Sequence, residues 1–228
     1  MQRSTVKLVL AVLSFPVVLS AQSDQADRVR DAAVVLQEIM GAPDKAIPKS
    51  VLEKAEAVAV FPGTLKGGFV IAAHRGRGII SVRDRSAHRW SKPAFLTLTG
   101  GSIGAQIGGQ SIDIVLIVMN RRGLDNLLQN QFKIGASAGV AAGPVGRDAQ
   151  AATDIQLRAE ILSYSRSRGL FAGVSLEGSG VRQDRDWNEE FYGDPLRSRS
   201  IVIDGKGTPK APDVVRQWVE TLSKYAGM

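Results

Sequence analysis

The sequence predicts an α+β fold in which a mainly antiparallel, glycine-rich β-sheet, or a partly closed barrel, carries packed N-terminal and C-terminal helices. Short β-rich runs separated by glycine or charge fill the middle of the chain, and helical periodicity flanks them on both sides. With 44% hydrophobic and 22% charged residues among 228, the chain has enough apolar side chains for one core. We divide it into a leader at 1–21, a helical segment at 22–56, a β-rich core at 57–204 and a C-terminal helix at 205–228.

Residues 1–21 have the pattern of a secretory signal peptide. Two basic residues, Arg3 and Lys7, precede an apolar run at 8–19, and small residues follow up to Ala21. The apolar run is shorter than the roughly 20 residues that a helix needs to cross a bilayer, so a membrane anchor is the weaker interpretation. The sequence therefore predicts an exported protein, periplasmic or secreted.

Helices are expected on both sides of the β-rich core. Apolar residues recur every three or four positions from Asp24 to Met40, which is typical of an amphipathic helix, and a glycine and a proline follow. A shorter helix is expected at 47–54, with Pro48 in its first turn, where the missing N–H is tolerated. The last helix is expected at 212–226 and should pack on the sheet through one apolar stripe.

Between the helices, β-rich runs alternate with short helical patches. The helical patches are expected at 121–130 and 186–192. The strands are expected at 57–61, 68–73, 78–83, 94–99, 112–118, 131–142, 169–176 and 199–203.

Two sets of glycines lie four residues apart in this region: Gly100, Gly104 and Gly108, and Gly135, Gly139 and Gly143. On a strand this spacing places each set on one face, where another backbone can approach closely. On a helix it is the small-residue stripe of membrane helix pairs, but the polar residues between Ala94 and Met119 favour strands.

Several classes of protein are excluded by what the sequence lacks. Because there is no cysteine, it has no disulfide scaffold, no thiolate zinc site, no cysteine nucleophile and no lipidated cysteine. It also lacks the zinc-binding His-Glu-x-x-His pattern, the phosphate-binding Walker loop and the dinucleotide-binding glycine motif. No catalytic residue, metal site or cofactor is predicted, and the protein is expected not to be an enzyme.

A nucleophilic serine at Ser137 is retained only as a rival hypothesis. Residues 135–139 match the Gly-x-Ser-x-Gly pattern of hydrolases, which needs a strand, a tight turn and then a helix. The residues that follow are a poor helix start, and the only histidines, His74 and His88, precede the serine. A chance match is therefore the preferred interpretation.

A calcium loop is the other motif that we considered. Asp184, Asp186 and Asn188 resemble its beginning, but Glu189 and Pro195 stand where glycine and glutamate are needed. A helix cap formed by Asp184 or Asp186 is preferred.

Clustered positive charge is the strongest functional signal in the sequence. The chain has 29 Lys and Arg against 22 Asp and Glu, and the segment 66–92 has seven of these cations with Asp84 as its only acid. Residues 74–78 are expected to form a hairpin tip that holds Arg75 and Arg77 away from the core. Arg85, Arg89 and Trp90 follow in the next connection, where the tryptophan suits a membrane interface.

A solvated positive face is the plain alternative to a binding patch. Nucleic acid is not expected as a partner, because aromatic residues are few and no RNA-binding aromatic strand is present.

Ordered sequence blocks resemble the SYLF domain family (Ysc84-like actin- and lipid-binding domain) over roughly residues 30 to 205. The blocks are 47–52, 57–63, 66–70, 90–95, 100–109, 113–120, 143–147, 164–173 and 188–193.

The resemblance implies a non-enzymatic, peripheral lipid-binding module, since members bind phospholipids, including phosphoinositides in eukaryotes. It also implies membrane contact by an amphipathic helix within 24–54, although the stripe with Val29 and Leu36 is better explained as core packing. The expected partner is an anionic phospholipid surface, and the alternative is a cell-envelope protein. Yeast relatives bind actin, which is not expected as a ligand of an exported protein. The expected head-group contacts are Lys45, Lys49, Lys54, Lys66, Arg75 and Arg77.

Overall fold

The computed structural model describes residues 23–42, 46–67, 71–103, 110–135, 139–146, 158–167 and 170–227. Its helices are α1 (Asp24–Met40), α2 (Lys49–Lys54), α3 (Arg121–Leu127), α5 (Arg185–Tyr192), α6 (Ser198–Val202) and α7 (Pro212–Ala226). Its strands are β1 (Ala57–Gly67), β2 (Ile71–Asp84), β3 (Arg89–Trp90), β4 (Ala94–Ile103), β5 (Gln110–Val118), β6 (Gln131–Lys133), β7 (Val140–Ala142), β8 (Ile161–Ser167), β9 (Leu170–Gly173) and β10 (Gly180–Gln183).

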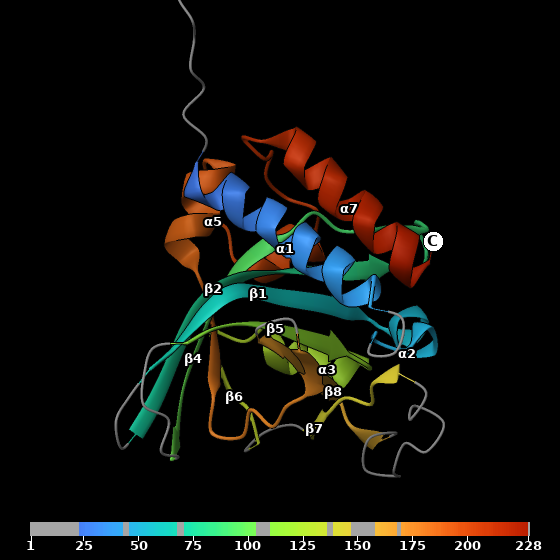
Figure 1. Ribbon diagram of the computed structural model, residues 1–228. Helices are drawn as coiled ribbons and strands as arrows, with labels where there is room; N and C mark the ends of the chain where they lie inside the picture. The colour runs from blue at the N-terminus through green and yellow to red at the C-terminus, as the bar shows by residue number, and fades with distance from the viewer. Residues whose placement is uncertain are drawn as a thin grey trace, which may run out of the picture.

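One curled, mostly antiparallel sheet forms the body of the protein, as the sequence predicts (Figure 1). The strands follow the order β6-β10-β4-β2-β1-β5-β8-β7, with β3 paired to β2 and β9 paired to β8. Only β7 and β8 pair in parallel among the described strands. The two longest strands, β1 and β2, therefore lie in the middle of the sheet, where both of their edges are paired.

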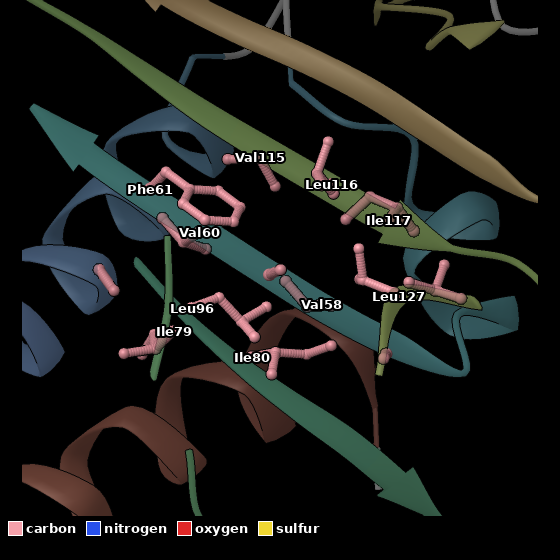
Figure 2. Packing of buried hydrophobic residues seen from close by; sticks show 14 of the residues in the cluster. Val58, Val60, Phe61, Ile79, Ile80, Leu96, Val115, Leu116, Ile117 and Leu127 are labelled. Atoms are coloured by element: carbon pink, nitrogen blue, oxygen red, sulfur yellow. The ribbon is translucent and has the colours of Figure 1, made fainter. Parts of the chain in front are cut away.

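The hydrophobic core lies on both faces of these central strands. Every residue of β1 from Ala57 to Phe61 is buried, which explains its unbroken apolar run. Residues 114–118 of β5 are buried in the same way. Figure 2 shows side chains of β1, β2, β4 and β5 in this core, with Leu127 of α3 beside them.

Helices α1 and α7 lie side by side over one face of the sheet (Figure 1). The α1 stripe is buried, with Val29 and Leu36 both 0% exposed, so this stripe packs in the core. Trp218 of α7 is also fully buried and donates a hydrogen bond from its indole nitrogen to Ser81 Oγ at 2.8 Å. Within the described part of the chain, no helix is both long enough and apolar enough to span a bilayer.

The predicted strand at 199–203 is wrong, because Ser198–Val202 forms α6. Its apolar residues are consecutive and do not alternate, and both Ile201 and Val202 are buried. A strand would place these two neighbours on opposite faces, whereas a short helix across β4 buries both. The sequence also did not predict β8 or β10.

The second glycine set does not share one strand as predicted. Gly135 lies in a turn after β6 with φ of +90°, and only residues 140–142 between Gly139 and Gly143 form a strand. In the first set, Gly100 lies on β4 and a Cβ there would come 2.4 Å from the His74 ring. Gly104 and Gly108 lie outside the described residues.

Candidate functional site

Arg75 and Arg77 lie within a continuous strand, so the predicted hairpin tip at 74–78 is wrong. Strand β2 pairs with β4 without interruption from Ile71 to Ile80. Since side chains alternate along a strand, the two exposed arginines share one face, and Gly76 and Gly78 lie on the other.

The two glycines are needed because strand β1 bulges against them. The register between β1 and β2 shifts between Val60 and Leu65, and Gly63 in this bulge has φ of +58°. A Cβ on Gly76 would lie 2.2 Å from Thr64 Oγ1, and one on Gly78 would lie 2.3 Å from the Val60 carbonyl oxygen. The glycines therefore allow close approach of two strands and do not mark a turn.

A groove of about 430 Å³ lies over this bulge, between α1, β2 and α5. Its volume is within the range of about 300–1,000 Å³ that small-molecule sites occupy. We call it the bulge groove; its lining residues are Asp24, Asp27, Arg28, Asp31, Gly63, Arg75, Gly76, Arg77 and Trp187.

Arg77 is held in place on one wall of the bulge groove. Its Nε donates a hydrogen bond to Asp184 Oδ2 at 2.9 Å, and its guanidinium carbon lies 4.5 Å from the centre of the Trp187 ring. Asp184 is buried, accepts a second hydrogen bond from Thr97 Oγ1 at 2.9 Å, and caps α5, as the sequence predicts. The Arg77 side chain is still 42% exposed, so it combines a fixed orientation with access from solvent.

Helix α1 is tied to the bulge by charged side chains. Arg28 donates to the Pro62 carbonyl oxygen at 2.5 Å, and the Gly63 N–H donates to Asp113 Oδ1 at 2.9 Å. Arg166 of β8 bridges Asp113 and Glu38 of α1. The desolvation that lowers the Arg166 pKa is outweighed by these two carboxylates, which raise it. These contacts fix the position of the groove wall that α1 supplies.

Three carboxylates of α1 line the bulge groove together with the arginines of β2. They belong to Asp24, Asp27 and Asp31, and Asp27 forms an ion pair with Arg30 at 2.5 Å. Sequence reasoning missed these acids as groove residues, although their spacing of three and four positions along a helix is the signal of a shared face.

Two of the other predicted head-group contacts, Lys49 and Lys54, do not line this groove. Lys49 and Lys54 are exposed on α2, whose last carbonyl groups lie close to Arg85 at the far end of β2; Arg85 donates to the Lys54 carbonyl oxygen at 3.3 Å. The extended chain from Arg77 to Arg85 spans about 26 Å. Lys66 lies on β1, but the structure describes only its backbone. Lys45 lies outside the described residues.

Arg83 of β2 packs on Trp90 and binds carbonyl groups at the ends of α2 and α7; we call this buried contact the joint. Arg83 donates to the carbonyl oxygens of Leu52, Ala55, Ala226 and Gly227, and its guanidinium carbon lies 4.5 Å from the Trp90 ring centre. Desolvation lowers the Arg83 pKa. Trp90 is only 3% exposed, so the prediction that it faces a membrane interface is wrong.

The described residues assemble no metal-binding cluster of His, Asp or Glu side chains. Ser137 lies outside the described residues. His74 lies 3.0 Å from the hydroxyl of another serine, Ser179, but that serine lies just before β10 and is only 1% exposed.

Together, the curled sheet, its two covering helices and the bulge groove define an α+β domain with a charged, ligand-sized site. The family described as "Ysc84: Las17-binding protein actin regulator" matches residues 99–225. The chain belongs to this family, in agreement with the resemblance of its sequence blocks.

Similar proteins occur in fungi and vertebrates. Protein YSC84 of Saccharomyces cerevisiae is 32% identical over 206 residues, which cover 89% of this chain and 43% of the yeast protein. SH3 domain-containing YSC84-like protein 1 of Xenopus laevis is 36% identical over 203 residues, 86% of this chain and 59% of the frog protein. LAS seventeen-binding protein 3 of S. cerevisiae is 31% identical over 206 residues, 89% and 44% of the two chains. The chain thus spans about half the length of these relatives.

Proposed function

We propose that this protein is a non-enzymatic phospholipid-binding module that contacts the head-group phosphate in the bulge groove. The observation that carries this proposal is the preorganised Arg77, with Arg75 on the same face of a central strand. A guanidinium fork matches the geometry of phosphate oxygens, and little of its order is lost on binding when the side chain is already fixed.

The spacing of the two arginines supports a single phosphate as their shared ligand. Two residues along a strand correspond to about 7 Å, a distance that two long arginine side chains bridge easily. Arg75 forms no ion pair within the described part of the chain, and Arg77 uses its Nε for Asp184. Binding through hydrogen bonds and charge requires no covalent step.

Export is the second part of this proposal. Residues 1–21 would direct the protein out of the cytoplasm, to a periplasmic or secreted location at a membrane surface. The measurement is the mass of the protein recovered from each cell fraction. A mature chain that begins near residue 22 in the exported fraction supports export, and a full-length chain confined to the cytoplasm contradicts it.

Vesicle flotation tests the lipid-binding proposal. The vesicles contain phosphatidylethanolamine and phosphatidylglycerol, and the variant is Arg75→Glu, which changes an exposed groove residue. Reversing one charge beside a phosphate weakens the binding free energy by about 2 kcal/mol, which lowers the affinity about thirtyfold. The matched control is Arg182→Glu, an exposed strand residue of β10 outside the groove.

The comparison of these two variants decides the outcome. Groove binding predicts that Arg75→Glu leaves the vesicle fraction while Arg182→Glu remains with it. Equal behaviour of the two variants, or no flotation of the unmodified protein at low salt, refutes phosphate binding at this site.

Binding of a protein partner is the second candidate function, because the family description names Las17 binding and actin regulation and one relative's name refers to LAS seventeen binding. Co-sedimentation of the purified chain with filamentous actin tests one such partner directly. Saturable co-sedimentation favours this function, and its absence removes actin as a ligand of this chain.

A further inference from the structure

The bulge groove holds opposite charges that do not pair with each other. Asp24 and Asp31 on α1, and Arg75 on β2, line the same cavity, and none of the three forms an ion pair within the described ranges. Both kinds of charge line one cavity of about 430 Å³, so both signs of charge are available to a ligand.

The two walls are fixed by independent parts of the fold. Arg77 is oriented by Asp184 and Trp187, on the sheet side. On the helix side, α1 is held to the bulge by Arg28 and to β8 by its Glu38. The position of Arg77 and the position of the α1 backbone at the groove are therefore each set by tertiary contacts.

The dipole of helix α1 explains the positions of only some of its aspartates. Acids in a first helical turn are stabilised by the helix dipole, which accounts for Asp24 and Asp27. Asp31 lies in the second turn, where this effect fades, and it has no basic partner in the described ranges. Its exposed carboxylate adds negative charge to a groove that the arginines alone would make attractive to anions.

We propose that the bulge groove binds a zwitterion, a phosphate diester that carries a primary ammonium group, as in a phosphoethanolamine head group. Arg75 and Arg77 contact the phosphate, and Asp24 and Asp31 accept hydrogen bonds from the ammonium. This inference rests on the proposed phospholipid-binding function and names its ligand class. Three aspartates and three arginines line the groove, a balance that suits a ligand without net charge.

Soluble head groups test this inference without a bilayer. The probes are glycerophosphoethanolamine and glycerophosphoglycerol, which share the phosphate diester but differ in the ammonium group. The unmodified protein should bind the first about tenfold more tightly, the effect of two partly exposed charge contacts. The variant Asp24→Asn with Asp31→Asn should lose this preference, and Asp194→Asn with Asp204→Asn, which changes two exposed acids elsewhere, should keep it.

The sign of the change separates the inference from a purely anionic site. If the groove binds phosphate alone, removing the aspartates relieves repulsion, and both probes bind more tightly. If the groove binds the zwitterion, glycerophosphoethanolamine binds more weakly. Tighter binding of both probes by the aspartate variant, or equal affinities in the unmodified protein, overturns the inference.

Vesicles distinguish a membrane lipid from a free head group as the source. Loss of flotation by the aspartate variant on phosphatidylethanolamine vesicles, with no soluble probe bound, supports the inference for the bilayer lipid only. Flotation that depends on Arg75 but not on the two aspartates overturns the zwitterion inference and preserves the phospholipid function. Flotation that is unchanged both in the Arg75→Glu variant and in the aspartate variant overturns both proposals.

Discussion

The variant Gly78→Ala tests the close approach of β1 and β2 that places the arginines at the groove. An alanine Cβ at this position would lie 2.3 Å from the Val60 carbonyl oxygen and 2.5 Å from Cδ1 of Phe61. Both neighbours are fully buried in a central strand, so neither can swing away into solvent. Relief requires the two central strands to separate.

The magnitude follows from this overlap. Added methyl groups in well-packed cores destabilise proteins by about 1–3 kcal/mol, and contact with backbone places Gly78→Ala near the upper end. A change of 1 kcal/mol shifts the melting temperature of a protein of this size by about 2–4 °C. We therefore expect the melting temperature to fall by about 6–12 °C.

The assay is thermal unfolding followed by circular dichroism, with Gly180→Ala as the matched control. Gly180 also lies in a strand, but the nearest atom to the position that an alanine Cβ would take there is 3.7 Å away, an ordinary contact. The control should melt close to the unmodified protein, since Gly→Ala at a compatible site changes stability by only about 0.4–1 kcal/mol. Equal melting temperatures for the two variants would refute the close-approach argument and favour a tolerant turn at 74–78.

Three further predictions concern the joint, the arginine support and α1. Arg83→Ala should lower the free energy of unfolding, measured in urea, by about 3 kcal/mol or more, because buried carbonyl groups lose their donors. An unchanged free energy of unfolding would show that the joint does not stabilise the fold. Asp184→Asn should keep the cap of α5 and most of the stability of the protein, but it should weaken vesicle binding because Arg77 loses its charged partner. Unchanged flotation would show that Asp184 does not orient Arg77 for binding. Gln37 Nε2 donates to Thr221 Oγ1 at 3.2 Å, so cysteines at these two positions can be joined by a bifunctional thiol reagent that links α1 to α7 in a chain without other cysteines. Flotation should survive the cross-link, whereas its loss would show that α1 must leave the sheet.

Local periodicity was sufficient to predict the elements with strong, isolated patterns. The bounds of α1 and α7 were predicted as observed, because an amphipathic stripe of several turns is long enough to define a helix. The buried runs that begin β1 and form most of β5 were recognised from unbroken apolar residues. The short β8 and β10 carry mixed polar residues, and their pairing partners lie far away in the sequence, so no local pattern marked them.

The amino-acid sequence alone predicted the family, the α+β class and the two covering helices, and it singled out the arginines of β2 as candidate ligand contacts. The tertiary structure decided which charges meet. Gly76 and Gly78, which alternate with those arginines, look like turn residues locally, but they pack against the bulged part of the neighbouring strand β1. Asp184 lies 107 positions after Arg77, and the aspartates of the groove come from the opposite end of the chain. A charged site assembled from such distant segments depends on the packing of α1, β2 and α5, which no local pattern of residues encodes.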